Sequence, residues 1–148
     1  MIERIIREIT GLLRRVEQLE SQETYGPLVA WTPAVTQLGA VAATVTRARY
    51  RKIGQTITAW CNLAVTGAGT IGNIITVSVP VNMVAPSNWQ PVGTWVIYRG
   101  GTVYSGVVAG ASASTVGFWT YNVAAFEGGG YALANGDQVG IIIEYEVA

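Results

Sequence analysis

The sequence predicts an all-β domain of the sandwich or jelly-roll type, preceded by an N-terminal α-helical coiled coil that joins three copies. Half of all charged residues lie within residues 1–23, and the apolar residues there repeat with heptad spacing. The rest of the chain alternates apolar and polar residues in short runs between glycine-rich turns. We therefore expect a trimerisation stalk at 1–23, a linker at 24–30 and a β-sandwich head domain at 31–148.

The predicted stalk has apolar residues at heptad positions a and d through three heptads. The residues expected to make the contacts between helices are Ile2, Ile5, Ile9, Leu12, Arg15, Val16, Leu19 and Glu20. Isoleucine at both a and d in the first heptad, with apolar residues at e, favours more than two strands, so we expect a parallel homotrimer. The alternative is a single amphipathic helix packed on its own domain.

Beyond the linker, seven runs predict strands, each bounded by turn residues. They cover residues 41–51, 55–65, 74–79, 94–99, 102–108, 115–121 and 138–147. Arg99-Gly100-Gly101-Thr102 is the clearest hairpin, and Asp137 is expected in a turn after Asn135-Gly136. No helical segment separates the runs, which excludes a βα architecture. A β-helix is the lesser alternative because no fixed period repeats.

Composition limits the function classes. The 148 residues include nine basic and nine acidic side chains, no histidine and one cysteine. Without histidine, Ser-His-Asp and Cys-His catalytic sites and His-based zinc sites are excluded. No carboxylate pair is placed for glycoside hydrolysis. We expect a protein that is not an enzyme and that uses no cofactor or metal. The zero net charge disfavours nucleic acid as a partner, and no apolar run is long enough for membrane insertion.

The head segment carries short motifs in a defined order. They are Trp31-Thr32-Pro33, then Arg49-Tyr50-Arg51 with Gly54 and Trp60, then Ser78-Val79-Pro80, and finally Asn135-Gly136-Asp137 with Tyr145. This order, over about residues 30–148, resembles the small β domains of bacteriophage tail fibres and related virion proteins. The resemblance implies a trimeric fibre head on a fibrous stalk, located in the virion, assembled in the host cytoplasm and in contact with other virion proteins.

Two functions are compatible with such a head. The first is attachment to a host-surface glycan or receptor, and the second is a structural role as a head fibre or capsid decoration protein. Glycans are bound by aromatic faces beside hydrogen-bonding groups, which makes Trp89, Trp119 and Tyr121 the candidate ligand-binding residues. Trp60 and Trp95 lie inside alternating runs, so we expect them in the core or at a subunit interface.

Arg47, Arg49 and Arg51 recur with period 2 and are predicted to project from one face of a strand. One interpretation is a site for phosphate or an acidic glycan. The favoured interpretation is charge pairing with Glu144 and Glu146, which have the same period on the last strand, across adjacent strands or a subunit boundary.

Overall fold

The structure, a computed structural model, describes residues 8–15, 26–84, 90–119 and 131–147. Residues 8–15 are helical, and the side chains of Ile9, Leu12 and Leu13 on this helix are exposed. Five residues of the predicted heptad contacts lie outside the described residues: Ile2, Ile5, Val16, Leu19 and Glu20. A coiled coil and a trimer therefore stay predictions.

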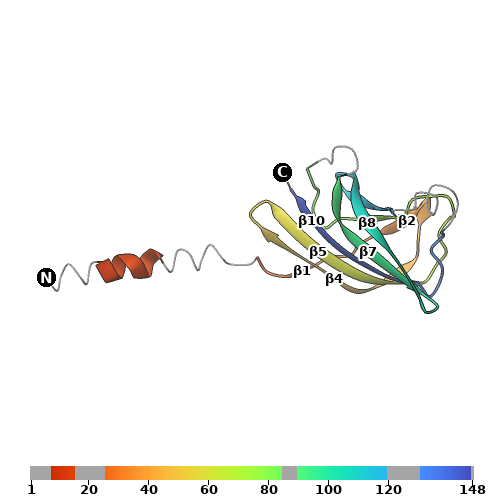
Figure 1. The fold of residues 1–148 in the computed structure, drawn as a ribbon, viewed down its shortest axis with the longest axis horizontal. Coiled ribbons are helices and arrows are strands. Elements are labelled where there is room, and N and C mark those ends of the chain that lie inside the picture. Colours follow the sequence, from red (N-terminus) through yellow and green to blue (C-terminus); the bar gives the residue numbers. More distant parts are fainter. Residues whose placement is uncertain (1–7, 16–25, 85–89, 120–130, 148) are drawn as a thin grey trace.

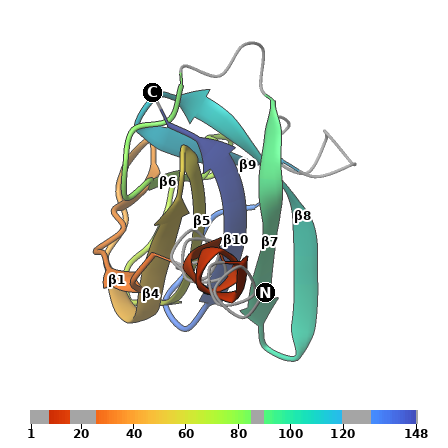
Figure 2. The ribbon, with the colours of Figure 1, turned by 90° about the vertical axis from the view of Figure 1, so that its left-hand side faces the viewer.

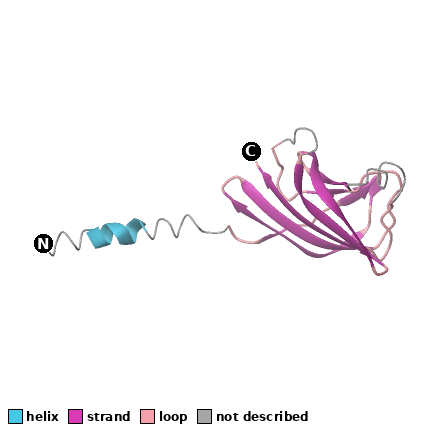
Figure 3. Ribbon diagram, in the orientation of Figure 1, coloured by secondary structure: helices cyan, strands magenta, loops and turns pink. Residues whose placement is uncertain are grey.

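The remaining described structure is built of strands (Figures 1 and 3). Ten are found: β1 Val29–Ala30, β2 Val35–Gln37, β3 Gly39–Ala40, β4 Ala43–Ile53, β5 Thr56–Val65, β6 Thr76–Ser78, β7 Pro91–Arg99, β8 Thr102–Ser112, β9 Thr115–Trp119 and β10 Gln138–Glu146. Each of the seven predicted runs contains a strand. The short strands β1, β2 and β3 were not predicted, because two or three residues are too few to show an alternating pattern.

All ten strands belong to one antiparallel sheet, in the order β1-β4-β5-β10-β7-β8-β9-β6-β2-β3. Figure 2 shows this sheet curling from β1 and β4 through β10 and β7 to β8, and returning through β9 to β6. The all-β prediction is confirmed, but the expected division into two separate sheets is not found. The last strand, β10, inserts between β5 and β7, and β9 links β8 to β6, so the sheet is continuous.

The inner face of the curled sheet forms the core. On β5 the buried residues alternate with mostly half-buried ones, and on β10 with mostly exposed ones, as the period-2 pattern predicts. Trp95 is buried and stacks on Phe118, with ring centroids 5.4 Å apart, and its Nε1 donates to the carbonyl oxygen of Trp119 at 2.9 Å. The core assignment of Trp95 is thus correct, whereas Trp60 is only half-buried and lies on the opposite, outer face.

Two predicted turns are confirmed. Arg99 and Thr102 pair at the end of the β7–β8 hairpin, where Gly100 and Gly101 have φ angles of 54° and 90° that favour glycine. Gly136 also has a positive φ, in the turn where the amide of Asp137 donates to the carbonyl of Ala134 at 3.1 Å.

Candidate functional site

The outer face of the sheet carries two rows of residues that cross neighbouring strands. In the first row each residue is the register partner of the next, from β4 to β9: Arg49, Trp60, Ile142, Thr94, Val107 and Trp119. The second row lies two residues away and runs from β4 to β8: Arg47, Asn62, Gly140, Val96 and Ser105. Neighbouring strands are about 5 Å apart, so each row is a continuous strip.

A hollow of about 660 Å³ lies between these rows. Among the residues that line it are Trp60, Asn62, Thr94, Val96, Ser105 and Ile142. Gly140 leaves the second row without a side chain at its centre. A Cβ atom there would lie 3.3 Å from both Asn62 Oδ1 and Val96 Cγ1, so even alanine would fit tightly. The hollow therefore opens where β10 carries glycine between the side chains of β5 and β7.

A β-bulge in β4 places the side chains of Arg47 and Arg49 on this outer face. Val45 pairs with Leu63 on the inner face, and the register then shifts so that Arg47 pairs with Asn62 on the outer face. The hydroxyl of Thr46, the extra residue, donates to the carbonyl of Asn62 at 2.8 Å. Without the bulge, simple alternation from Val45 would turn Arg47 towards the core.

Several polar groups at the hollow are available for a ligand. Within the described part of the chain, the side chains of Asn62, Thr94 and Ser105 make no hydrogen bond to other residues, and all three are exposed. Arg49 Nη1 donates to the carbonyl of Ala48 at 3.2 Å. The site thus combines an indole, an amide, two hydroxyls and, one strand away, two guanidinium groups.

The favoured interpretation of Arg47, Arg49 and Arg51, charge pairing with the glutamates of the last strand, is corrected in part. β5 lies between β4 and β10, so the arginines and glutamates are not on adjacent strands. Glu144 shares a row with Arg51, with Thr58 between them, and the Thr58 hydroxyl donates to Glu144 Oε2 at 3.3 Å. Among the described residues, Arg47 and Arg49 form no ion pair.

Of the three candidate ligand-binding residues, Trp119 is described. It is half-buried and ends the first row, next to Val107, which also lines the hollow. Trp89 and Tyr121 lie outside the described residues. Trp60 and Asn62 were missed as site residues, although both stand on the mixed face of the 55–65 run. That mixed face was the available signal, and the expectation that Trp60 lies in the core or at a subunit interface obscured it.

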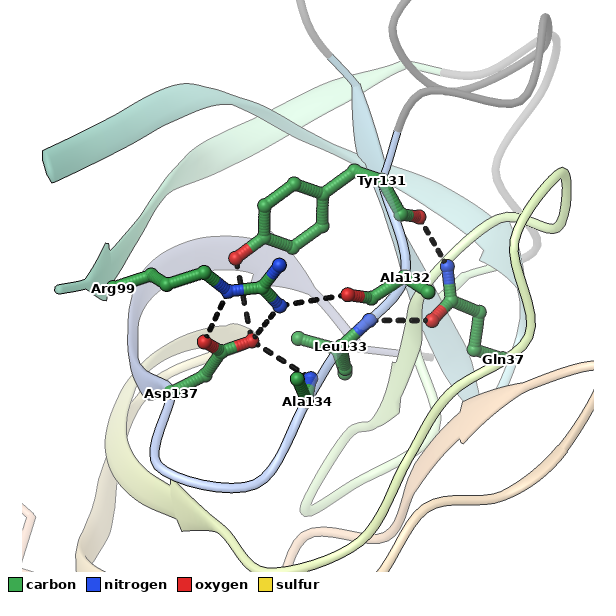
Figure 4. A network of polar contacts seen from close by, with 7 residues as sticks. All are labelled: Gln37, Arg99, Tyr131, Ala132, Leu133, Ala134 and Asp137. Atoms are coloured by element: carbon green, nitrogen blue, oxygen red, sulfur yellow. Dashed lines mark hydrogen bonds and ion pairs between the residues drawn. The ribbon is translucent and has the colours of Figure 1, made fainter.

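A second polar cluster lies near the β7–β8 hairpin (Figure 4). Arg99 donates from Nε and Nη2 to the carboxylate of Asp137, which is 1% exposed, and also from Nη2 to the carbonyl of Ala132 at 2.7 Å. The hydroxyl of Tyr131 and the amide of Ala134 donate to Asp137 Oδ2 at 3.2 and 2.9 Å. The guanidinium carbon of Arg99 lies 4.3 Å from the centroid of the Tyr131 ring.

This cluster is a structural clamp. Burial alone would raise the pKa of Asp137, but the hydrogen bonds from Arg99 and Ala134 outweigh it and hold the pKa below its ordinary value. Burial and the nearby Asp137 carboxylate raise the pKa of the Tyr131 hydroxyl. At ordinary pH the carboxylate of Asp137 is therefore ionised and hydrogen-bonded, and the phenol of Tyr131 is protonated, so neither group is suited to acid–base chemistry. The contacts of Arg99 instead fix the segment before β10 to the hairpin.

Among the described residues, no three His, Cys, Asp or Glu side chains converge as possible metal ligands. No helix within the described ranges has the length and apolar character to cross a membrane. Comparison of the chain with protein-family models, with curated proteins and with solved structures finds no match.

Proposed function

We propose that this chain is a non-enzymatic bacteriophage virion protein, a homotrimeric fibre or spike head that attaches the particle to a host-surface glycan or receptor. The observation that carries the proposal is the outer-face row that joins Trp60 to Trp119 beside a hollow with exposed amide and hydroxyl groups. Aromatic faces next to unpaired hydrogen-bonding groups are the usual elements of a saccharide site.

The exposed apolar side of the helix supports a trimer. Ile9 and Leu12 occupy the predicted a and d positions, and Leu13 the e position, and all three are more than half exposed in the single chain. A short isolated helix is marginally stable in water, and partner helices that cover this seam would stabilise it. Three heads on one stalk would also bind a repetitive surface with avidity, which compensates for weak single sites.

The alternative function, a structural head fibre or capsid decoration protein, is favoured by a different feature of the same face. Val96, Val103 and Ile142 are 41%, 62% and 61% exposed there, and Tyr98 lies beside them. An exposed apolar patch of this kind is suited to contact with another protein of the virion.

The two functions are separated by binding of the intact chain to a panel of bacterial cells and to a glycan array. Attachment predicts binding that Trp60→Ala and Trp119→Ala each weaken by about 1–3 kcal/mol, the cost of losing an aromatic anchor. Tyr98→Ala is the matched control, because Tyr98 is an exposed aromatic on the same face that belongs neither to the lining of the hollow nor to the row of Trp60 and Trp119. Circular dichroism must show that each variant keeps its strands. If the wild-type chain binds neither cells nor glycans, the structural function replaces attachment.

A further inference from the structure

We infer that the hollow between Trp60 and Ser105 binds an acidic glycan, with the sugar ring against Trp60 and its carboxylate or phosphate at Arg47 and Arg49. This inference rests on the proposed attachment function and specifies the ligand class of that site. It follows from three features of the outer face, each taken over the described residues: an aromatic wall, polar groups without a hydrogen-bond partner, and a positive rim without a neighbouring carboxylate.

The aromatic wall is provided by Trp60. It is half-buried, so its ring is held by its neighbours while part of it stays accessible. Ile142 lies beside it on β10, and Gly140, which has no side chain, lines the hollow next to Asn62. Sugar rings present C–H groups on one face and pack against such a surface. At about 660 Å³ the hollow falls within the range of small-ligand sites, roughly 300–1,000 Å³.

The polar groups are spread along the length of the hollow. Asn62 offers an amide on β5, Thr94 a hydroxyl on β7 and Ser105 a hydroxyl on β8. An amide and hydroxyls both donate and accept hydrogen bonds, which matches the hydroxyls of a saccharide. A purely apolar partner would leave these groups without hydrogen bonds on burial, at a cost in free energy.

The charge expected on the ligand follows from the positive rim, which consists of Arg47 and Arg49. Arg49 is the register partner of Trp60 and Arg47 that of Asn62, so both guanidinium groups stand one strand from the hollow on the same side. Residues two apart on a strand are about 7 Å from each other, so the two like charges repel. Within the described part of the chain, the outer-face carboxylate of Glu144 lies in the row of Arg51 and Thr58 instead. An anionic group on the ligand would therefore supply the missing counter-charge, as charge-assisted hydrogen bonds to arginine do.

The inference is tested with the intact chain on an array that pairs uronate-, sialate- and phosphate-bearing oligosaccharides with their neutral counterparts. We expect at least one acidic oligosaccharide to bind about tenfold or more tightly than its neutral partner, and this preference to weaken with added salt. The double variant Arg47→Gln/Arg49→Gln should lose the preference. Lys52→Gln is the matched control, because Lys52 pairs with Ile57 and so lies in register with the inner face of β4. It should leave the preference unchanged.

Five outcomes would overturn the inference. Equal binding of acidic and neutral partners, or an unchanged preference in the double arginine variant, removes the charge argument. Binding to bacterial cells without binding to any saccharide keeps the attachment function but rejects a glycan in this hollow. Protection of Trp60 and Ile142 from hydroxyl-radical labelling in the intact assembly, without ligand, would show that a second copy or another protein covers the face. Absence of binding to both cells and saccharides rejects the inference and the attachment function together.

Discussion

Arg99 holds the buried carboxylate of Asp137 through two hydrogen bonds, from Nε to Oδ1 at 2.6 Å and from Nη2 to Oδ2 at 2.5 Å. The two residues are 38 positions apart, so the contact joins the end of β7 to the turn before β10. Bidentate pairing of this kind fixes geometry as well as charge, because the planar guanidinium matches the carboxylate.

Replacing Asp137 by alanine should strongly destabilise the fold. The substitution removes a buried charge partner and leaves the amide of Ala134 without its acceptor. Because Arg99 keeps part of its side chain in solvent, we expect a loss towards the lower end of the about 3–5 kcal/mol typical of broken buried pairs. Urea unfolding measures this change. Glu144→Ala, an exposed site, serves as the control and should change stability by less than about 0.5 kcal/mol.

The same pair should make the stability depend on pH at the acid end. The folded pKa of Asp137 lies below its ordinary value of 3.8, so folding favours the ionised carboxylate. This contribution is complete above the unfolded pKa and is lost as the pH falls through the folded pKa, which places the loss below about pH 4. Urea midpoints compared at pH 6 and pH 3 should therefore fall less in Asp137→Asn than in the wild type. An equal fall in both would contradict the assignment.

A third prediction concerns Gln37, which joins β2 to the loop of Asn73 and to the segment before β10. Its side chain is buried and takes the place of a peptide group: Nε2 donates to the carbonyls of Tyr131 and Asn73 at 2.8 and 3.0 Å, and Oε1 accepts from the amide of Leu133 at 2.9 Å. Gln37→Leu should cost about 1–3 kcal/mol for each buried group left without a partner.

Thermal or urea unfolding measures the effect, with the exposed Thr70→Ala as a control in the neighbouring loop. A stability within about 0.5 kcal/mol of the wild type would mean that water replaces the lost hydrogen bonds.

The burial of Cys61 predicts an inert thiol. Desolvation raises the pKa of this thiol from its ordinary value of 9.0 to about 12. Because the thiolate is the reactive form, a thiol reagent at pH 8 should label the folded chain very slowly and the urea-unfolded chain rapidly. The raised pKa also means that Cys61 contributes stability below about pH 9 that is lost as the pH rises towards 12. Fast labelling of the folded chain would contradict its burial.

The elements with strong local patterns were predictable from the sequence. The alternation of β5 and β10 and the glycines of the β7–β8 hairpin depend on neighbouring residues alone. That Arg47, Arg49 and Arg51 share one face of a strand was also predicted, but the bulge at Thr46 that turns this face outward was not, because a single inserted residue leaves no periodic signal.

The contacts that make the candidate site come from distant parts of the chain. Trp60 and Trp119 belong to one row only because β10, β7 and β8 lie between their strands in a particular order. Asp137 was correctly predicted in a turn, yet its pairing with Arg99 depends on the same order. Strand order in a curled sheet is decided by long-range packing, and a single sequence does not display it.

The last prediction concerns assembly through the helix. In the predicted heptads Ile9 and Leu12 occupy the a and d positions, and both side chains are exposed in the isolated chain. Aspartate at both positions would place unpaired charge in the seam between helices, which costs several kcal/mol when water is excluded. The double variant Ile9→Asp/Leu12→Asp should therefore sediment at the mass of one chain at micromolar concentration, while the wild type sediments at the mass of three. Arg14→Asp introduces the same residue at the outward-facing f position and should remain trimeric. Because the described helical residues 8–15 contribute no side chain to the buried core, far-UV circular dichroism should keep its strand signal in all three proteins. A wild-type mass of one or two chains would contradict the trimer itself.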